Sequence, residues 1–478
     1  MNLPVDFIYS VRTQFGEEME PFVAALAEDT PVSIRLNPFK KQRNHLAFLR
    51  PAERVPWSEQ GYYLAERPSF TFDPLFHAGY YYVQEASSMF VEHVVRELVS
   101  APVICLDLCA APGGKSVSLL SALPEESLLV SNEIVRQRAN VLSETLIKFG
   151  HPNTVVTQNS AMDFAAFPGL FDLILVDAPC SGEGMFRKDE VAIQEWSPQN
   201  VKMCAARQKD ILGDVWPALK PGGLLVYSTC TYNSDENEDN VRWAANNLGA
   251  AFTKVEVDAG WNIVPSHDDE AGGYHFYPHK VKGEGLFVAV LRKPGTEVPE
   301  TDFRPKKNRK PTVVPIKDPA DYAKLITNPE LFHLMESDDR ITALPKVHAE
   351  TIVTLMHNLK CVSAGIELGQ MRGKDFIPAH ALAMSIALNR QVFYNHEVTY
   401  EQAIAYLRKE AIALSDAPRG MVLLTWQNEP LGFVKNIGNR ANNLYPNEWR
   451  IRSGYLPDKK PEILAPEQPV PPAESFTF

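Results

Sequence analysis

Strands and helices alternate between about residues 90 and 293, and this alternation constrains the fold more than any other feature of the sequence. Parallel strands need crossover connections, usually helices, so the alternation predicts an α/β fold with a doubly wound, mostly parallel sheet. Ligands of such a sheet bind at the carboxyl ends of its strands. The expected strands cover residues 103–108, 128–132, 154–157, 171–176, 224–228 and 285–292, and the expected helices cover residues 89–99, 135–149 and 202–219.

The chain has 478 residues, which is long enough for several domains around the predicted sheet at 91–293. Residues 1–90 form a small N-terminal domain. Residues 294–315 form a Pro-rich linker that carries several basic side chains. Beyond the linker we expect a small α+β domain at 316–375 and a compact β-rich module at 376–478, where apolar residues alternate with turn residues.

Composition excludes several classes of protein. With 45% hydrophobic and 22% charged residues, the chain has the balance of a globular protein with a substantial core. We find no apolar run of ~20 residues and no signal peptide, so we expect a cytoplasmic protein without a membrane partner. The six cysteines include no C-x-x-C pair, which argues against a metal site and a disulfide framework. The net charge of −12 does not exclude a nucleic-acid partner, because phosphates respond to local basic surface.

A loop of small residues follows the first expected strand, in the segment Ala110-Ala-Pro-Gly-Gly-Lys115. Glycine at this position lets backbone amides approach a ligand closely. The loop is not a Walker A phosphate loop, because that motif requires glycine where Cys109 stands. Glu133 ends the next strand and can accept hydrogen bonds from ribose hydroxyls. These features predict a nucleotide-like cofactor, although an α/β domain with another ligand also fits them.

Two cysteines lie beside turns that follow core strands, in Asp177-Ala-Pro-Cys180 and in Ser228-Thr-Cys230. Both thiols are therefore expected in one crevice beside the cofactor loop. A thiolate that adds to C6 of cytosine makes C5 nucleophilic enough to take a methyl group from a sulfonium donor. Asp177 is the candidate acid at the edge of the base. On chemistry alone, either Cys180 or Cys230 could be the nucleophile, whereas Cys105, Cys204 and Cys361 are interpreted as core residues.

The three motifs together resemble the Sun-type RNA (cytosine-5)-methyltransferases. Supporting segments are Arg35-Leu-Asn37, Gln84-Glu-Ala-Ser-Ser88, Arg207-Gln208 and Gly283-Glu-Gly-Leu-Phe287, together with Glu236-Asn-Glu238 after the second cysteine. The resemblance covers about residues 1–293, while Gly432-Phe-Val-Lys435 and Asn443-Leu-Tyr-Pro446 are similar to the PUA-like module of the RsmF (YebU) branch, which methylates cytidines of 16S ribosomal RNA. It implies a Rossmann-like class I methyltransferase sheet with a small N-terminal α+β domain and C-terminal α+β and PUA-like β-rich modules.

The resemblance also implies roles for individual residues. Cys230 becomes the covalent nucleophile, Cys180 assists release of the methylated product, and S-adenosylmethionine is the cofactor. Asp177 lies between the methyl group and the base, and Glu133 binds the ribose. The family has an acid near the adenine where this chain has Ser160, so either Ser160 or Asp163 is expected there. The residues expected around the methionine part of the cofactor are Cys109, Ala110, Ala111, Pro112, Gly113, Gly114 and Lys115.

RNA is the expected partner, as 16S ribosomal RNA or the small ribosomal subunit, and the chain is expected to act as a monomer. Candidate RNA contacts are Arg35, Asn37, Arg187 and Lys188. One alternative is an RNA-binding or ribosome-assembly protein whose methyltransferase fold is catalytically silent, against which the intact Cys230 argues. Another is a methyltransferase for proteins or small molecules, which would need no cysteine nucleophile.

Overall fold

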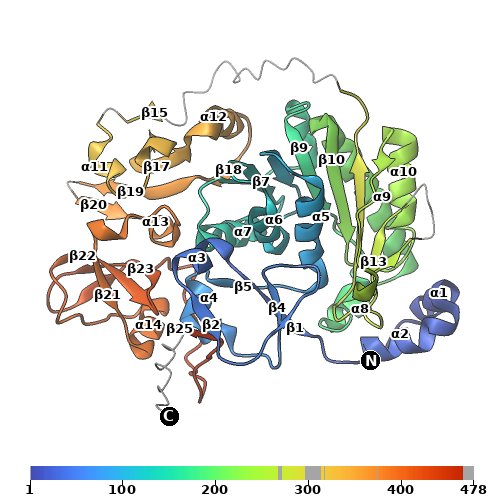
Figure 1. The fold of residues 1–478 in the computed structure, drawn as a ribbon, viewed down its shortest axis with the longest axis horizontal. Coiled ribbons are helices and arrows are strands. Elements are labelled where there is room, and N and C mark those ends of the chain that lie inside the picture. The colour runs from blue at the N-terminus through green and yellow to red at the C-terminus, as the bar shows by residue number, and fades with distance from the viewer. Residues whose placement is uncertain (1, 267–271, 297–313, 317, 374, 467–478) are drawn as a thin grey trace, which may run out of the picture.

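A sheet of ten strands forms the centre of the computed structural model, which describes residues 2–266, 272–296, 314–316, 318–373 and 375–466 (Figure 1). Five strands run parallel in the order β10-β9-β6-β7-β8. These are β6 (Ile104–Asp107), β7 (Leu128–Asn132), β8 (Thr154–Thr157), β9 (Phe171–Asp177) and β10 (Leu219–Thr229). The other five are antiparallel to their neighbours: β11 (Ala251–Phe252), β12 (Val264–Pro265), β13 (Tyr274–Phe276), β14 (Leu286–Arg292) and β18 (Cys361–Ala364).

Helices cover both faces of this sheet because its parallel strands are apolar on both sides. Alternate residues of each strand enter different cores, as Cys105 and Leu106 of β6 do. The first core contains α5 (Phe90–Leu98), α6 (Gly114–Ala122) and α7 (Arg136–Phe149). The second contains α9 (Pro198–Val215), α10 (Glu238–Leu248) and α12 (Ala349–Asn358). The predicted doubly wound α/β sheet is therefore confirmed.

One edge of the central sheet comes from far along the chain. Strand β18 pairs antiparallel with β8, with Cys361 opposite Thr157 and Ala364 opposite Val155. Helix α12, just before β18, buries Ile352 in the second core. Part of the segment 316–375 thus completes the central sheet rather than lying beside it.

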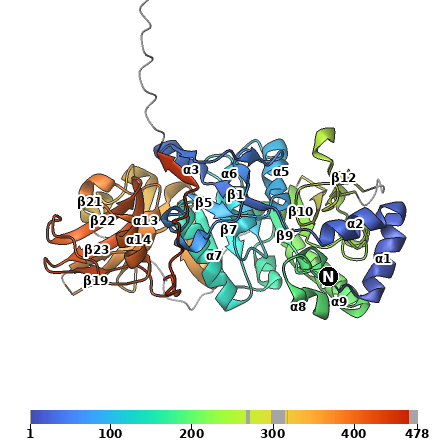
Figure 2. The ribbon, with the colours of Figure 1, turned by 90° about the horizontal axis from the view of Figure 1, so that it is seen from below.

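The N-terminal region divides into two parts that lie at different places on the central domain (Figure 2). Helices α1 (Val5–Phe15) and α2 (Met19–Leu26) pack against the region of α8 (Glu190–Glu195), where Phe7 contacts Phe186 and Trp196 edge to face. The remainder forms a four-stranded sheet in the order β3-β4-β1-β5. Its elements are β1 (Val32–Leu36), α3 (Pro38–Arg43), β3 (Glu53–Arg54), β4 (Gly61–Leu64), α4 (Pro74–His77) and β5 (Tyr81–Val83).

Two further sheets follow and occupy the opposite end of the molecule from α1 and α2 (Figure 1). The first has the order β15-β16-β17-β19-β20 and the second β21-β22-β23-β24. The first comprises β15 (Val314–Pro315), β16 (Phe332–Ser337), β17 (Arg340–Pro345), β19 (Ile366–Arg372) and β20 (Asp375–Pro378), near α11 (Ala320–Ala323) and α13 (His380–Met384). The second comprises β21 (Tyr394–Glu397), β22 (Gly420–Trp426), β23 (Glu429–Asn436) and β24 (Ala441–Asn443), with α14 (Tyr400–Leu407).

The chain then returns to the N-terminal region, where β25 (Leu464–Pro466) pairs with β2 (Leu46–Phe48). Most of the predicted basic linker, residues 297–313, lies outside the described residues. Within the described part of the chain, no helix combines the length and apolar character needed to cross a membrane.

Candidate active site

The loop between β6 and α6 opens on a cavity of about 310 Å³ at the carboxyl ends of the parallel strands. Gly113 caps α6 in the left-handed region, with φ of 114°. A Cβ on Gly113 would lie 2.8 Å from Cγ2 of Thr145, so a larger residue would force the loop away from α7. The loop and strand ends contribute Asp107, Cys109, Ala110, Ala111, Pro112, Gly114, Lys115, Asp177 and Cys230 to the lining.

A buried carboxyl group lies beneath the loop. The Ser116 hydroxyl donates to Oδ2 of Asp107 over 2.6 Å, and Oδ1 of Asp107 has no partner within the described structure. Burial raises the pKa of Asp107 to about 7, although the hydrogen bond from Ser116 opposes the shift. The unpaired Oδ1 is a buried acceptor beside the cavity, where a ligand group could satisfy it.

Lys115 and Asp177 form an ion pair in the cavity, with 2.9 Å between Nζ and Oδ2. The Ser228 hydroxyl donates to Oδ1 of Asp177 over 2.8 Å, so both carboxylate oxygens have partners. Burial disfavours the charge of Lys115, but the neighbouring Asp177 outweighs it and raises the pKa of the ammonium group. This pair places a fixed cation and a fixed carboxylate beside Cys230.

The two cysteines predicted to share a crevice do so, because their sulfur atoms are 3.1 Å apart. The contact with Cys230 is the main cause that raises the pKa of the Cys180 thiol far above its usual value, and burial adds to it. The backbone amide of Gly184 donates to the carbonyl of Cys230 over 2.8 Å and joins the two loops. A Cβ on Gly184 would lie 2.8 Å from that carbonyl oxygen, so this close approach requires glycine.

Buried side chains behind the thiols hold both loops, and the sequence analysis gave none of them a role. Glu236 accepts hydrogen bonds from the Ser181 amide at 3.0 Å, from Nε2 of Gln208 at 2.7 Å and from Nδ2 of Asn233 at 2.9 Å. Glu183 accepts from the Tyr232 amide at 2.7 Å. A charged residue closely following each cysteine was the available signal, but its partners could not be known from sequence.

Residues at the ends of β7 and β8 are the candidates for binding the nucleoside part of the cofactor. Oε1 of Glu133 accepts from the Val135 amide over 2.9 Å and Oε2 pairs with Arg138 over 3.4 Å, so ribose hydroxyls would use the remaining lone pairs of these two oxygens. Ile134 and Met162 are 62% and 65% exposed, and such apolar side chains suit the faces of an adenine ring. Neither residue is a candidate from sequence, because the exposure of these side chains is visible only in the structure.

Ser160 and Asp163 contact each other rather than the cavity. Oδ2 of Asp163 accepts from both the amide and the hydroxyl of Ser160, each over 2.9 Å. This capping box begins the short 3-10 helix Ala161–Ala166, which carries Met162. The two residues therefore shape the segment beside the expected adenine site.

The prediction that Arg35 and Asn37 contact RNA is wrong, because both side chains are 0% exposed. Arg35 of β1 pairs over 2.8 Å with Glu92 of α5, a helix that packs on the central sheet. Asn37 donates to the carbonyl of Phe149 over 2.8 Å and thereby joins the N-terminal region to α7. These two residues hold the domains together and do not belong to an RNA surface.

Arg187 and Lys188 lie near the cavity and differ in their partners. The guanidinium of Arg187 donates to the carbonyls of Glu28 at 3.2 Å, Asp29 at 2.8 Å and Gly283 at 3.0 Å. Lys188 lines the cavity and pairs with Glu284 over 2.6 Å. Burial raises the pKa of Glu284 to about 7, with a further contribution from Glu85. The remaining lining residues are Tyr82, Val83, Gln84, Glu85, Ser88, Gly184, Met185, Gly285 and Leu286.

No group of His, Cys, Asp or Glu within the described residues could hold a metal ion.

The sheet order, the glycine loop and the acid after β7 together define a Rossmann-like methyltransferase. Among solved structures, a methyltransferase homologue from Pyrococcus horikoshii is 26% identical, with a TM-score of 0.51, and covers 60% of this chain and 94% of its own. NSun6 from the same organism, solved with SFG, is 21% identical, has a TM-score of 0.51 and shows the same fold over 61% of this chain and 99% of its own.

Curated relatives match nearly the whole chain. Ribosomal RNA small subunit methyltransferase F of Pectobacterium atrosepticum is 31% identical over 95% of this chain and 96% of its own. Its counterpart in Salmonella agona is 32% identical over 93% of this chain and 96% of its own. The chain therefore belongs to the ribosomal RNA small subunit methyltransferase F family, and the expected cofactor, S-adenosylmethionine, is confirmed.

Family profiles match three separate parts of the chain. Residues 100–292 match 16S rRNA methyltransferase RsmB/F, and residues 3–86 match the N-terminal domain of 16S rRNA methyltransferase RsmF. Residues 393–451 match the methyltransferase RsmF PUA domain, which confirms the predicted PUA-like module.

Proposed function

We propose that this S-adenosylmethionine-dependent methyltransferase acts on C5 of cytidine in ribosomal RNA through a covalent intermediate with Cys230. The observation that carries the proposal is the 3.1 Å contact between the sulfurs of Cys180 and Cys230 at the carboxyl ends of β9 and β10. Methyl transfer to an amino nitrogen requires no cysteine, whereas C5 of cytosine requires a nucleophile at C6. The family to which the chain belongs supports ribosomal RNA as the substrate.

In the proposed reaction, the Cys230 thiolate adds to C6, and the electron pair of the C5–C6 double bond becomes available at C5. When bound, S-adenosylmethionine would supply the methyl group that C5 takes, with the sulfur of the cofactor as the leaving group. Asp177, held by Lys115 and Ser228, is positioned to hydrogen-bond the cytosine edge as charge redistributes. Lys115 supplies a fixed positive charge beside the electron-rich ring.

Release requires transfer of the C5 proton to a base, a role that solvent water can fill, and cleavage of the bond between C6 and Sγ of Cys230. The electrons of the broken C5–H bond rebuild the C5–C6 double bond, and the thiolate of Cys230 is regenerated. Cys180 lies in contact with Cys230 and has a raised pKa, so it holds a proton at neutral pH. A protonated thiol at this position can hydrogen-bond the departing thiolate, which gives Cys180 its role in product release.

The covalent step is tested by expressing Cys180→Ala in cells and resolving protein from RNA by denaturing electrophoresis. We expect an adduct to accumulate, because the protein can add to cytidine but releases product slowly. The double variant Cys180→Ala/Cys230→Ala should give no adduct. Cys204→Ala, which removes a buried thiol on α9, is the matched control and should behave as the wild type.

An adduct that persists in the double variant would remove Cys230 from the role of nucleophile. Absence of any adduct, together with no methyl transfer by the wild type to hypomodified small subunits, would favour the catalytically silent RNA-binding protein.

We further propose 16S ribosomal RNA, within the small subunit, as the substrate of a protein that acts as a monomer in the cytoplasm. Family descriptions support the substrate. Mapping the methylated cytidine in reconstituted subunits checks the substrate, and native mass spectrometry of the complex gives the number of copies bound.

A further inference from the structure

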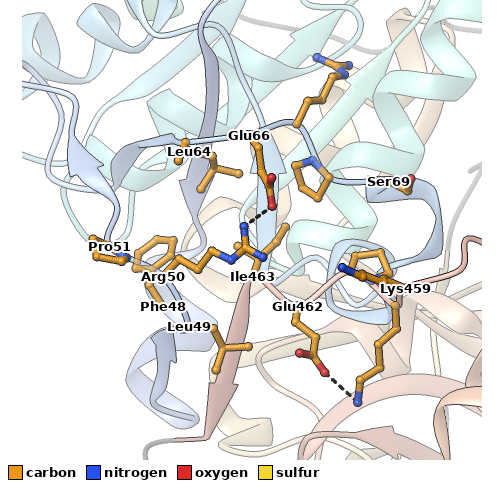
Figure 3. A pocket seen from close by; sticks show the side chains of 15 residues that line it. Phe48, Leu49, Arg50, Pro51, Leu64, Glu66, Ser69, Lys459, Glu462 and Ile463 are labelled. Atoms are coloured by element: carbon orange, nitrogen blue, oxygen red, sulfur yellow. Dashed lines mark hydrogen bonds and ion pairs between the residues drawn. The ribbon is translucent and has the colours of Figure 1, made fainter.

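A second hollow, which we call the tail groove, lies where the end of the described chain meets the N-terminal region (Figure 3). Its volume is about 790 Å³, within the ~300–1,000 Å³ range of ligand sites. None of its lining residues lines the active-site cavity. Three segments form it: residues 48–51 after β2, residues 64–69 after β4, and residues 459–463 before β25.

The walls of the tail groove are fixed to one another by the backbone. Strand β2 pairs with β25, with Phe48 opposite Leu464. The Leu49 amide then donates to the carbonyl of Ile463 over 3.0 Å, which extends the pairing into the groove. The second wall leaves β4 at Leu64, whose side chain packs with Ile463 in the same apolar cluster. The groove is therefore a feature of the folded core and not a gap between loose loops.

Cationic side chains outnumber acidic ones in the tail groove, although the whole chain has a net charge of −12. Its two carboxylates are already paired, Glu66 with Arg50 and Glu462 with Lys460, the latter pair at 2.9 Å (Figure 3). The remaining cations are Arg67 and Lys459. Both are exposed, and neither has an ion pair within the part of the chain that the structure describes.

Arg67 lies near an aromatic ring, and its guanidinium makes no hydrogen bond within the described residues. Its guanidinium carbon lies 5.8 Å from the ring centroid of Phe70. The N–H groups of the guanidinium therefore remain available for an acceptor. The apolar lining residues of the groove include Phe48, Leu49, Leu64 and Ile463, of which Leu49 is 50% exposed. Cations at the edge of an apolar surface suit a single-stranded nucleic acid, with phosphates on the cations and a base on the apolar floor.

We propose that the tail groove binds single-stranded RNA and that Arg67 and Lys459 contact its phosphates, as a second attachment point outside the active-site cavity. This proposal rests on the proposed function, because the single-stranded RNA in the groove is part of the proposed RNA substrate. Through it, the N-terminal region and the end of the chain together contribute to substrate affinity.

The test uses the full-length protein and a fluorescein-labelled 12-residue oligouridylate, followed by anisotropy at several salt concentrations. This probe contains no cytidine, so its binding does not depend on capture by Cys230. For Arg67→Glu/Lys459→Glu we expect affinity to fall by about tenfold or more at low salt, since two phosphate contacts become repulsive. The slope of log affinity against log salt should become shallower by roughly 1.4, at ~0.7 for each contact to a single strand.

The matched control is Arg12→Glu/Lys346→Glu, which makes the same charge change at two exposed positions outside the groove. A control that weakens binding as much as the groove variant would show a general charge effect and overturn the proposal. Failure of the wild type to bind oligouridylate at 50 mM salt would also overturn it.

Lysine acetylation read by mass spectrometry tests the site directly in the unmutated protein. Oligouridylate should slow acetylation of Lys459 at least threefold and leave Lys346 unchanged. Equal protection of the two lysines, or of neither, would contradict the proposal. Because neither measurement involves methyl transfer, a failure here leaves the cysteine mechanism standing, and loss of the Cys230 adduct leaves the groove standing.

Discussion

Asp107 lowers the free energy of unfolding at neutral pH, because its carboxyl group is buried beneath the cofactor loop. Its pKa is raised to about 7 by burial, above the ~3.9 of an unfolded aspartate. Between these values the native state binds more protons than the unfolded state, so this residue lowers the free energy of unfolding as pH rises from 4 to 7. Asp107→Asn removes that dependence. We expect the variant to gain stability relative to the wild type across this range, by up to a few kcal/mol at ~1.4 per pKa unit.

Urea unfolding at pH 5, 6, 7 and 8 measures the difference between the two proteins. Asp172→Asn is the control, since Asp172 is 27% exposed and pairs with Lys220 over 2.8 Å. Loss of that pair should destabilise the protein at neutral pH. If the Asp107→Asn difference stayed constant from pH 5 to pH 8, burial of an ionisable Asp107 would be the wrong explanation.

Arg35 shows why residue-scale prediction from sequence fails for some charged side chains and succeeds for the two cysteines. Cys180 and Cys230 each follow a strand of one parallel sheet, so the topology alone brings them to the same edge. Arg35 owes its burial to Glu92, which lies 57 residues away on α5 and was not identifiable as its partner. A strand-end position is a local property of the sequence, whereas a buried ion pair is not.

The same contrast holds for whole elements. The ranges predicted at 128–132 and 154–157 coincide with β7 and β8, because continuous apolar runs between turns mark buried parallel strands. Strand β18 was not predicted, although it lies in the same sheet. Its sequence, Cys-Val-Ser-Ala, has no distinctive pattern, and its position depends on the unpaired edge of β8 about 200 residues earlier. Long-range pairing of a short strand leaves little trace in local sequence.

Arg187 helps to hold helices α1 and α2 against the central domain. Arg187 donates to the carbonyls of Glu28 and Asp29 just after α2, and to Gly283. Arg187→Lys keeps the charge but loses the planar fork that reaches three acceptors. We expect faster hydrogen exchange in residues 5–26 and a loss of about 1–3 kcal/mol in unfolding free energy, with RNA affinity unchanged.

Lys188→Arg, which retains the charge beside Glu284, is the neighbouring control and should leave exchange in α1 and α2 as it is. Unchanged exchange in Arg187→Lys, accompanied by weaker RNA binding, would instead assign Arg187 to the RNA surface.

At the scale of the whole molecule, the methyltransferase sheet and the segment after the linker form one packed unit. Ile352, Leu355 and Leu359 from α12 and its end lie in the same core as Val130 and Val155 of the central sheet. Domain boundaries drawn from composition at residues 293 and 316 therefore separate parts that share a core. Composition predicts a linker, but it carries no information on where the chain packs after it.

Leu355→Ala tests this shared core. Leu355 is fully buried, so its truncation should cost about 2–5 kcal/mol. Because α12 packs on the central sheet, we expect hydrogen exchange to accelerate in β7 and β8 as well as in α12.

Ile341→Ala is the matched control, since Ile341 is 1% exposed in a different core, among β17, β19 and α13. Its effect should stay within the five-stranded sheet. Faster exchange confined to residues 318–373 in Leu355→Ala would mean that this segment opens independently, and cofactor affinity would then be unaffected by it. Faster exchange in β8 would instead couple α12 to the loop that follows β8, where Ser160 and Met162 lie, and should weaken cofactor binding without any change in the cavity lining.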